Sequence, residues 1–242
     1  MDKHSIYDQE NYVVEYEEDR YGGSFGRYLR DIEVKNFSSF IEATHNRVLD
    51  VGAGTGKLCI PLSSQSREVI ALDLSKEMIR ISKMNADIED VRIMTVVCDA
   101  EQLCFDDKTF DCVVSSRLLM HLTDWRNGIS EMCRVSKFLL IIEFPPFSSF
   151  AVIDSFFKKL EKFFISSTQT YKTFLIKSVI EELKRNQFEV VTVNRQFFLP
   201  IIVHRWFNNP WLSKRIENLC KMTGLIRLMG APVTVKAVRK NQ

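Results

Sequence analysis

Three glycines stand close together at Gly52, Gly54 and Gly56, directly after the apolar run Arg47–Val51. This spacing allows a sharp turn from a strand into a helix, because glycine adopts backbone angles that other residues disfavour. The bare backbone of such a turn can also approach a ligand closely at the N-terminus of the helix that follows. Dinucleotide-binding turns have the pattern Gly-x-Gly-x-x-Gly, and here Lys57 occupies the place of the third glycine. The turn therefore favours a ligand other than NAD.

Two carboxylates follow the next apolar runs. Asp73 ends the run Glu68–Asp73, and Asp99 with Ala100 comes directly after the run at 91–97. If these runs are parallel strands, their carboxyl ends meet in one crevice beside the glycine turn. Asp73 could then accept hydrogen bonds from both hydroxyls of a ribose, and Asp99 could accept one from an adenine amino group. The residues thus suit a ligand that contains adenosine.

The rest of the chain supplies the elements that would position these residues. Short apolar runs alternate with segments of helical period, which is typical of a parallel sheet with helices on both faces. The predicted strands are 47–51, 68–73, 91–97, 110–115, 138–144, 188–198 and 233–238. The predicted helices are about 29–42, 57–64, one starting at 75, 118–135, two amphipathic helices around 153–164 and 176–183, and a helical stretch at 200–230.

The predicted fold is α/β, with a Rossmann-like, doubly wound, seven-stranded and mostly parallel sheet and helices on both faces. It has an N-terminal helical cap and a helical insert between strands six and seven. At 242 residues the chain is long enough for one such domain and too short for two. We expect a single domain over 1–242, with a cap at 1–45, a cofactor-binding half at 46–146 and a substrate-facing half at 147–242 that contains the insert at 200–230.

Four motifs occur in an order and spacing that resembles a known family. They are Asp50-Val51-Gly52-Ala53-Gly54-Thr55-Gly56, Asp73-Leu74-Ser75-Lys76-Glu77-Met78, Asp99-Ala100 and Phe110-Asp111-Cys112-Val113-Val114-Ser115-Ser116. The chain is similar to class I S-adenosylmethionine-dependent methyltransferases, in the ubiquinone/menaquinone-biosynthesis branch with a domain of the methyltransferase 11 type. The resemblance covers residues 10–145 well and continues more loosely to 242. It implies S-adenosylmethionine as cofactor and S-adenosylhomocysteine as product, and leaves the acceptor open.

The resemblance also implies which residues hold this cofactor. Asp50 would orient its ammonium group, Asp73 would hold the ribose, and Asp99 would read the adenine edge. The other implied contacts are the backbone of Gly52, Ala53, Gly54 and Gly56 around the methionine part, Leu74, Met78 and Ala100 around the adenine, Ser116 and Arg117 near the sulfonium, and Tyr16 and Arg20 near the carboxylate. Capping of the N-terminal helix is an equally open role for Tyr16 and Arg20.

No residue stands out as a catalytic base. His121 follows the fourth predicted strand and could face the methyl group, but a His in an apolar stretch commonly packs inside a helix. His204 in the insert is a second candidate. Methyl transfer is an in-line displacement, and alignment of the reacting atoms supplies much of its rate. An acceptor that is already ionised has no proton to lose.

Aromatic and basic residues in the second half of the chain favour a hydrophobic or aromatic anionic small molecule as acceptor. They are Phe147, Phe150, Phe197, Phe198, Trp206, Phe207 and Trp211, with Arg195, His204 and Arg205. Packing of these aromatics onto the sheet is the competing explanation. Two other functions stay open: methylation of tRNA or protein, and a non-catalytic scaffold that binds the cofactor. Nucleic acid is disfavoured, because no Pro-Pro-aromatic motif follows the fourth strand and no separate nucleic-acid-binding module is present.

Composition and charge limit the compartment, the bound metals and the partners that we expect. No apolar run reaches the roughly 18–20 residues that span a bilayer, and the polar N-terminus lacks the order of a signal peptide, so we expect a cytoplasmic protein without a transmembrane segment. Six cysteines show no metal-ligand spacing, so no metal site is expected. The net charge of +2 hides an asymmetry, with −9 over residues 1–133 and +11 over 134–242. This asymmetry indicates either an anionic partner or attraction between the two halves. The oligomeric state stays open.

Overall fold

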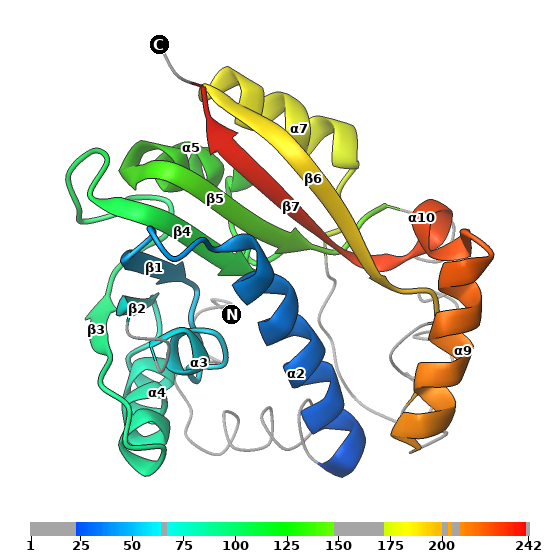
Figure 1. Cartoon of the computed structure of the whole chain (residues 1–242). Helices are drawn as coiled ribbons and strands as arrows, with labels where there is room; N and C mark the ends of the chain where they lie inside the picture. Colours follow the sequence, from blue (N-terminus) through cyan, green and yellow to red (C-terminus); the bar gives the residue numbers. More distant parts are fainter. Residues whose placement is uncertain (1–22, 64–66, 148–171, 200–202, 205–208, 241–242) are drawn as a thin grey trace.

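A computed structural model describes residues 23–63, 67–147, 172–199, 203–204 and 209–240. Its centre is a twisted seven-stranded sheet, whose strands are labelled in Figure 1. The strands are β1 (Arg47–Val51), β2 (Glu68–Asp73), β3 (Met94–Val97), β4 (Phe110–Ser116), β5 (Ser136–Phe144), β6 (Phe188–Phe197) and β7 (Ala231–Arg239). Their order in the sheet is β3-β2-β1-β4-β5-β7-β6, and β7 runs antiparallel to both of its neighbours.

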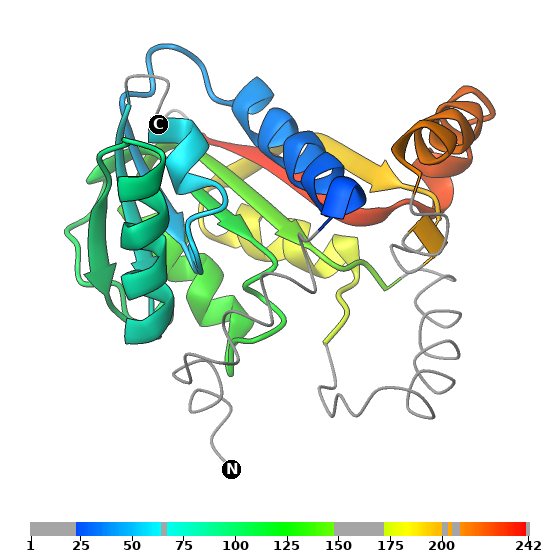
Figure 2. The ribbon, with the colours of Figure 1, turned by 90° about the horizontal axis from the view of Figure 1, so that it is seen from below.

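Helices cover both faces of this sheet, as Figure 2 shows from below. They are α2 (Gly23–Phe40), α3 (Cys59–Ser63), α4 (Lys76–Ile88), α5 (Trp125–Val135), α7 (Ile176–Arg185), α9 (Pro210–Met222) and α10 (Leu225–Met229). The core falls into two main clusters because neighbouring strand residues point to opposite faces. Leu49 packs with α5 and α7, whereas Val48 packs with α2 and α3.

The predicted fold class is confirmed: the sheet is seven-stranded, mostly parallel and Rossmann-like. The connection after β4 differs from the prediction, because the helix expected from residue 118 begins only at Trp125. The side chain of Asp124 caps this helix by accepting hydrogen bonds from the N–H groups of Arg126 and Asn127. Residues 117–124 therefore form a turn. The amphipathic helix expected around 153–164 lies outside the described residues.

The bounds of several elements also differ from the prediction. Helix α2 begins at Gly23, earlier than the expected 29, and β3 begins at Met94, later than the expected 91. In the described part of the insert, two helices, α9 and α10, take the place of the expected helical stretch. None of the described helices is long and apolar enough to cross a membrane.

Candidate functional site: a cavity at the carboxyl ends of the parallel strands

The glycine turn after β1 is held tightly by β2. The N–H groups of Gly52 and Ala53 both donate to the carbonyl of Leu72, at 2.8 and 2.9 Å. Gly52 and Gly54 have φ values of +73° and +55°, which side chains disfavour. A β-carbon on Gly52 would lie 2.9 Å from Leu118, whereas one on Gly54 would meet nothing within 4 Å. The turn therefore has no room for a side chain at Gly52, whereas no protein atom fills the space beside Gly54.

Asp73, at the end of β2, joins the glycine turn to the start of α4. One carboxylate oxygen accepts the N–H of Gly54 at 2.9 Å, and the other accepts the N–H of Ser75 at 3.0 Å. The hydroxyl of Ser75 in turn accepts the N–H of Met78 and caps α4, close to the start that the sequence predicted for this helix. Asp73 thus fixes the shape of the turn, a role that the sequence analysis did not foresee.

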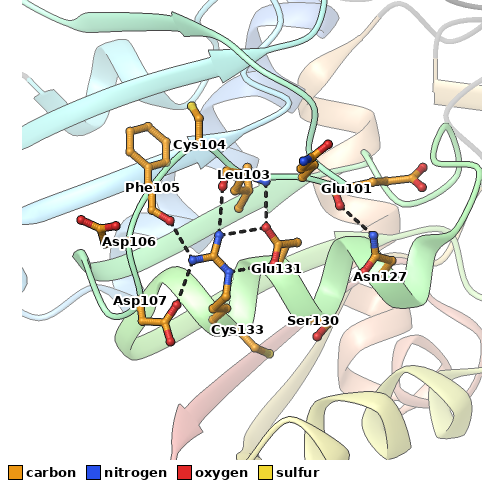
Figure 3. A network of polar contacts seen from close by, with 12 residues as sticks. Glu101, Leu103, Cys104, Phe105, Asp106, Asp107, Asn127, Ser130, Glu131 and Cys133 are labelled. Carbon is orange, nitrogen blue, oxygen red and sulfur yellow. Dashed lines mark hydrogen bonds and ion pairs between the residues drawn. The ribbon is translucent and has the colours of Figure 1, made fainter.

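The loop after β3 is anchored to α5 by a second set of contacts. Arg134 donates to the carbonyls of Leu103 and Phe105 at 2.9 and 2.7 Å, and Glu131 accepts the N–H of Leu103 at 2.8 Å. Figure 3 shows Leu103 and Phe105 above Glu131 on α5, with Asp107 to the left. Hydrogen bonds to Glu131 and Asp107 raise the pKa of Arg134, so its charge is permanent. This anchor holds the loop that begins with Asp99 and Ala100.

These loops enclose a cavity of about 240 Å³. It brings together most of the residues that the sequence analysis selected: Asp50, Gly52, Ala53, Gly54, Asp73, Leu74, Met78, Asp99, Ala100, Ser116, Arg117 and His121. Gly56 is not among the lining residues, and a β-carbon there would meet Ile60 and Ser82 instead. Gly56 therefore allows the turn to pack closely against α3 and α4. Tyr16 and Arg20 lie outside the described residues.

His121 lies in the turn after β4 and lines the cavity. Its N–H donates to the carbonyl of Leu118 at 2.8 Å. Because α5 begins four residues later, His121 is not part of a helix that packs on the sheet, as the competing explanation supposed.

Beside the cavity lies a buried cluster of two acids and two bases, which we call the four-charge cluster: Glu33, Lys57, Arg117 and Glu143. Glu33 comes from α2 and is 1% exposed, and Glu143 comes from the end of β5 and is 0% exposed. Arg117 donates to both carboxylates at 2.9 Å, and Lys57 pairs with Glu33. Lys57 and Arg117 line the cavity, so the cluster forms its wall.

The two carboxylates of this cluster titrate differently. Burial opposes the charge of Glu33, but Arg117 and Lys57 outweigh burial and lower the pKa of Glu33 to about 2. Burial and the neighbouring Glu33 raise the pKa of Glu143. Side chains from three other elements surround Glu143: Ser116 and Thr234 donate to it at 3.3 Å, and Gln196 also donates to it.

Sequence reasoning selected Arg117 but missed the cluster around it, although two other members have unusual positions in the sequence. Glu143 interrupts an apolar strand, and Lys57 stands where a dinucleotide-binding turn has glycine. Glu33 gave no signal, because its contacts with Ser116 and Arg117 join residues that are 83 and 84 positions apart.

Asp50 is the buried carboxylate of the cavity. Its oxygen Oδ2 has no hydrogen-bond partner among the described residues, although Asp50 is 1% exposed and lines the cavity. Burial raises the pKa of Asp50 to about 7, the backbone N–H of Cys59 opposes the rise, and Asp73 adds to it. A buried acceptor of this kind favours a ligand that brings a positive charge or a hydrogen-bond donor.

We expect S-adenosylhomocysteine to bind more tightly as the pH rises from about 5.5 to 7. Asp50 is mostly protonated at the lower pH and must lose its proton to face the ligand's ammonium group. Affinity should therefore rise by up to about tenfold per pH unit below the pKa and level off above it. Isothermal titration calorimetry over this range measures the effect.

The variant Asp50→Asn should bind more weakly and with a flatter pH dependence. Asp99→Asn is the matched control, because Asp99 lines the same cavity but is exposed, and it should keep the slope. An unchanged slope in Asp50→Asn would refute the role of Asp50.

Comparison with known proteins shows a similarity to methyltransferases. The family model described as "Methyltransferase domain" matches residues 48–138. A demethylmenaquinone methyltransferase of Clavibacter sepedonicus is 36% identical over 91 residues, which are 38% of this chain and 37% of the relative. A phosphatidylethanolamine N-methyltransferase of Cereibacter sphaeroides is 33% identical over 123 residues, which are 48% of this chain and 58% of the relative. The chain thus matches less than two thirds of the length of these relatives.

Among solved structures, the magnesium protoporphyrin IX methyltransferase from Synechocystis, crystallised with bound S-adenosylhomocysteine, is similar over 98% of both chains. Its TM-score is 0.71 at 15% sequence identity, which is a likeness of fold. The matched family model and the strand order of the sheet agree with the motifs found in the sequence. Residues 48–138 of the chain thus match a methyltransferase domain, and the motifs and strand order of the chain are similar to those of class I S-adenosylmethionine-dependent methyltransferases.

Proposed function

We propose that this protein transfers a methyl group from S-adenosylmethionine to a small, hydrophobic and negatively charged acceptor. The observation that carries the cofactor part is Asp50, whose buried oxygen lacks a partner among the described residues and lines the cavity. The open space at Gly54 lies on the same cavity and leaves room for a ligand against the backbone. An ammonium group beside Asp50 and a chain passing over Gly54 would fit both features.

Under this proposal, S-adenosylmethionine supplies an activated methyl group on its sulfonium. Asp50 orients the ammonium group, and Asp73 accepts from the ribose while it keeps its bonds to the turn. Asp99 has one oxygen bonded to the N–H of Glu101 at 2.8 Å, and it faces the adenine with Ala100. Leu74 and Met78 pack beside the ring. Ser116 and Arg117 border the place of transfer.

The acceptor part of the proposal draws on the exposed Phe147 after β5 and on the basic second half of the chain. It also draws on the two relatives, which are named for demethylmenaquinone and phosphatidylethanolamine. Other residues that the sequence offered have internal roles: His204 is bonded to Glu217 at 2.8 Å, and Arg195 donates to the carbonyl of Gly230 at 3.1 Å. Phe197 is buried against Leu29. Phe198 is half-buried beside Glu217, and Trp211 is exposed on α9. The other four candidates lie outside the described residues: Phe150, Arg205, Trp206 and Phe207.

We also propose that residues 1–242 act as one unit in the cytoplasm. The six cysteines are free thiols, which suits a reducing compartment.

Two measurements test the function. Calorimetry should detect binding of S-adenosylhomocysteine and none of NAD. A screen with methyl-labelled cofactor against phenolic acids, quinone precursors, fatty acyl compounds, tRNA and cell protein should then label a small molecule. Label that enters only tRNA or protein would overturn the acceptor class. Binding without transfer to any acceptor class would favour a non-catalytic scaffold.

A further inference from the structure

Helix α9 exposes large apolar side chains along its outward face. Trp211, Leu219 and Met222 are 61%, 62% and 85% exposed. At 100° per residue, Trp211 and Met222 lie near the middle of this face and Leu219 lies on its flank. The opposite face, with Ser213, Glu217 and Cys220, is buried against the rest of the protein. A helix that folds onto a domain normally buries its large apolar residues, and α9 leaves three of them outside.

The exposed charges around this face have one sign. Lys214, Arg215 and Lys221 on α9 and Arg227 on α10 are all exposed. Between residues 210 and 229 the one acidic residue is Glu217, which is 7% exposed. Its carboxylate is used internally, because it accepts the N–H groups of Phe198 and Leu199 at 2.8 and 3.0 Å. The outward face of α9 and α10 therefore combines apolar side chains with four positive charges and no negative one.

We propose that α9 docks this protein on an anionic lipid surface. Helices that lie in the membrane interface combine an apolar face with flanking lysines and arginines, and they bind through both burial and attraction to anionic lipid. The long stems of Lys214 and Lys221 can lie along the apolar region while their ammonium groups reach the lipid headgroups. The guanidinium of Arg215 lies 4.4 Å from the centre of the Trp211 ring, so this pair can enter the interface together.

The apolar residues distinguish lipid from nucleic acid as the partner. A nucleic acid gains from the cations and from stacking on Trp211. It gains little from Leu219 and Met222, which offer neither charge nor an aromatic ring. A lipid interface uses all of these groups, because the aliphatic side chains enter the acyl boundary while the cations meet the headgroups.

The position of α9 would bring the cavity toward the same surface. Both β5 and β6 run antiparallel to β7, so they share one direction and their carboxyl ends lie on one edge of the sheet. Glu217 fixes α9 to Phe198 and Leu199, directly after β6. Figure 1 shows α9 beyond this end of β6. The docking proposal does not depend on methyl transfer and can be tested without an acceptor.

Vesicle co-sedimentation tests the proposal. The full chain should bind vesicles of phosphatidylcholine with phosphatidylglycerol, bind vesicles of phosphatidylcholine alone far less, and release at high salt. The paired variant Lys214→Glu with Lys221→Glu should bind the anionic vesicles at least about tenfold more weakly, since each surface cation contributes roughly fivefold. The paired variant Leu219→Ser with Met222→Ser should also bind more weakly.

Helix α4 offers matched controls that change the same residue types elsewhere. Met84 and Ile88 are 48% and 79% exposed, and Lys76 and Lys83 are exposed on the same helix. Serine at Met84 and Ile88, or glutamate at Lys76 and Lys83, should leave vesicle binding within about twofold of the wild type. Calorimetry with S-adenosylhomocysteine, together with the thermal midpoint, reports whether the α9 variants are folded.

Three outcomes would overturn the proposal. The first is that the wild type fails to bind anionic vesicles. The second is that folded α9 variants bind as tightly as their α4 controls. The third is binding to tRNA, without vesicle binding, that the charge variant loses and the serine variant keeps, because this would assign the face to nucleic acid.

Discussion

Replacing Gly54 with valine is expected to abolish binding of S-adenosylhomocysteine, with a loss of at least about a hundredfold. A β-carbon at this position meets no protein atom within 4 Å, and Gly54 lines the cavity. The valine side chain would therefore occupy space that the ligand needs against the backbone. A β-branched residue also disfavours the φ value of +55° at this position. Both effects act on the turn that Asp73 holds through the N–H of Gly54.

The variant Gly224→Val separates these two effects. Gly224 has a φ value of +77° and equally open space around its β-position, but it lies between α9 and α10 and does not line the cavity. Valine there should strain the backbone in the same way and leave calorimetric binding unchanged. If Gly54→Val is folded and binds normally, the glycine turn does not contact the ligand.

The strands were predictable because their apolar runs are local and end at glycine, aspartate or proline. The predicted runs 47–51 and 68–73 coincide with β1 and β2, because each contains four consecutive buried residues, a pattern that no surface helix has. The start of α5 was not predictable from the same pattern. Leu118, Leu119 and Leu122 have helical spacing, but they pack into the core from a turn before the Asp124 cap.

The candidate site was also predictable only in part: the sequence indicated its residues but not their contacts. Asp50, Gly54, Asp73 and Asp99 were found because each lies where the chain leaves a strand, and parallel topology then brings these ends together. What each group contacts was not found. Asp73 supports the turn as well as facing the cavity, and Arg134 reaches a loop about 30 residues earlier in the chain. Such contacts depend on tertiary structure and produce no pattern in the local sequence.

Removing one charge from the four-charge cluster should cost more stability than removing any exposed charge. We expect Glu33→Gln to lower the free energy of unfolding by about 3 kcal/mol, because the partly buried cations Arg117 and Lys57 keep their charges with one carboxylate fewer. Urea unfolding with a constant m-value measures the loss. Glu89→Gln is the matched control. Glu89 also forms an ion pair with helix α2, through Arg30, but this pair is exposed. Its effect should stay below about 1 kcal/mol.

The loss of unfolding free energy in Glu33→Gln should also become smaller as the pH falls. Glu33 has a pKa of about 2 in the folded protein against an ordinary value of 4.5. A lowered carboxylate pKa stabilises the fold above the ordinary value, and this contribution disappears as the pH falls through the folded pKa. The difference in unfolding free energy between wild type and Glu33→Gln should therefore be full at pH 6 and shrink between pH 4.5 and 2. A difference that grows on acidification would contradict the assignment of the low pKa to Glu33.

The same variant should change which form of the cofactor the cavity prefers. The four-charge cluster has two carboxylates and two cations, so Lys57 and Arg117 present little net charge to the cavity that they line. Glu33→Gln leaves one positive charge uncompensated. S-adenosylmethionine carries a net charge of about +1 and S-adenosylhomocysteine carries none, so the added charge repels the substrate form alone. We expect the affinity for S-adenosylmethionine to fall several-fold more than that for S-adenosylhomocysteine, as measured by calorimetry on both ligands. An equal loss for the two ligands would contradict an electrostatic role of Glu33, because an uncompensated cation must weaken the binding of the positively charged ligand more.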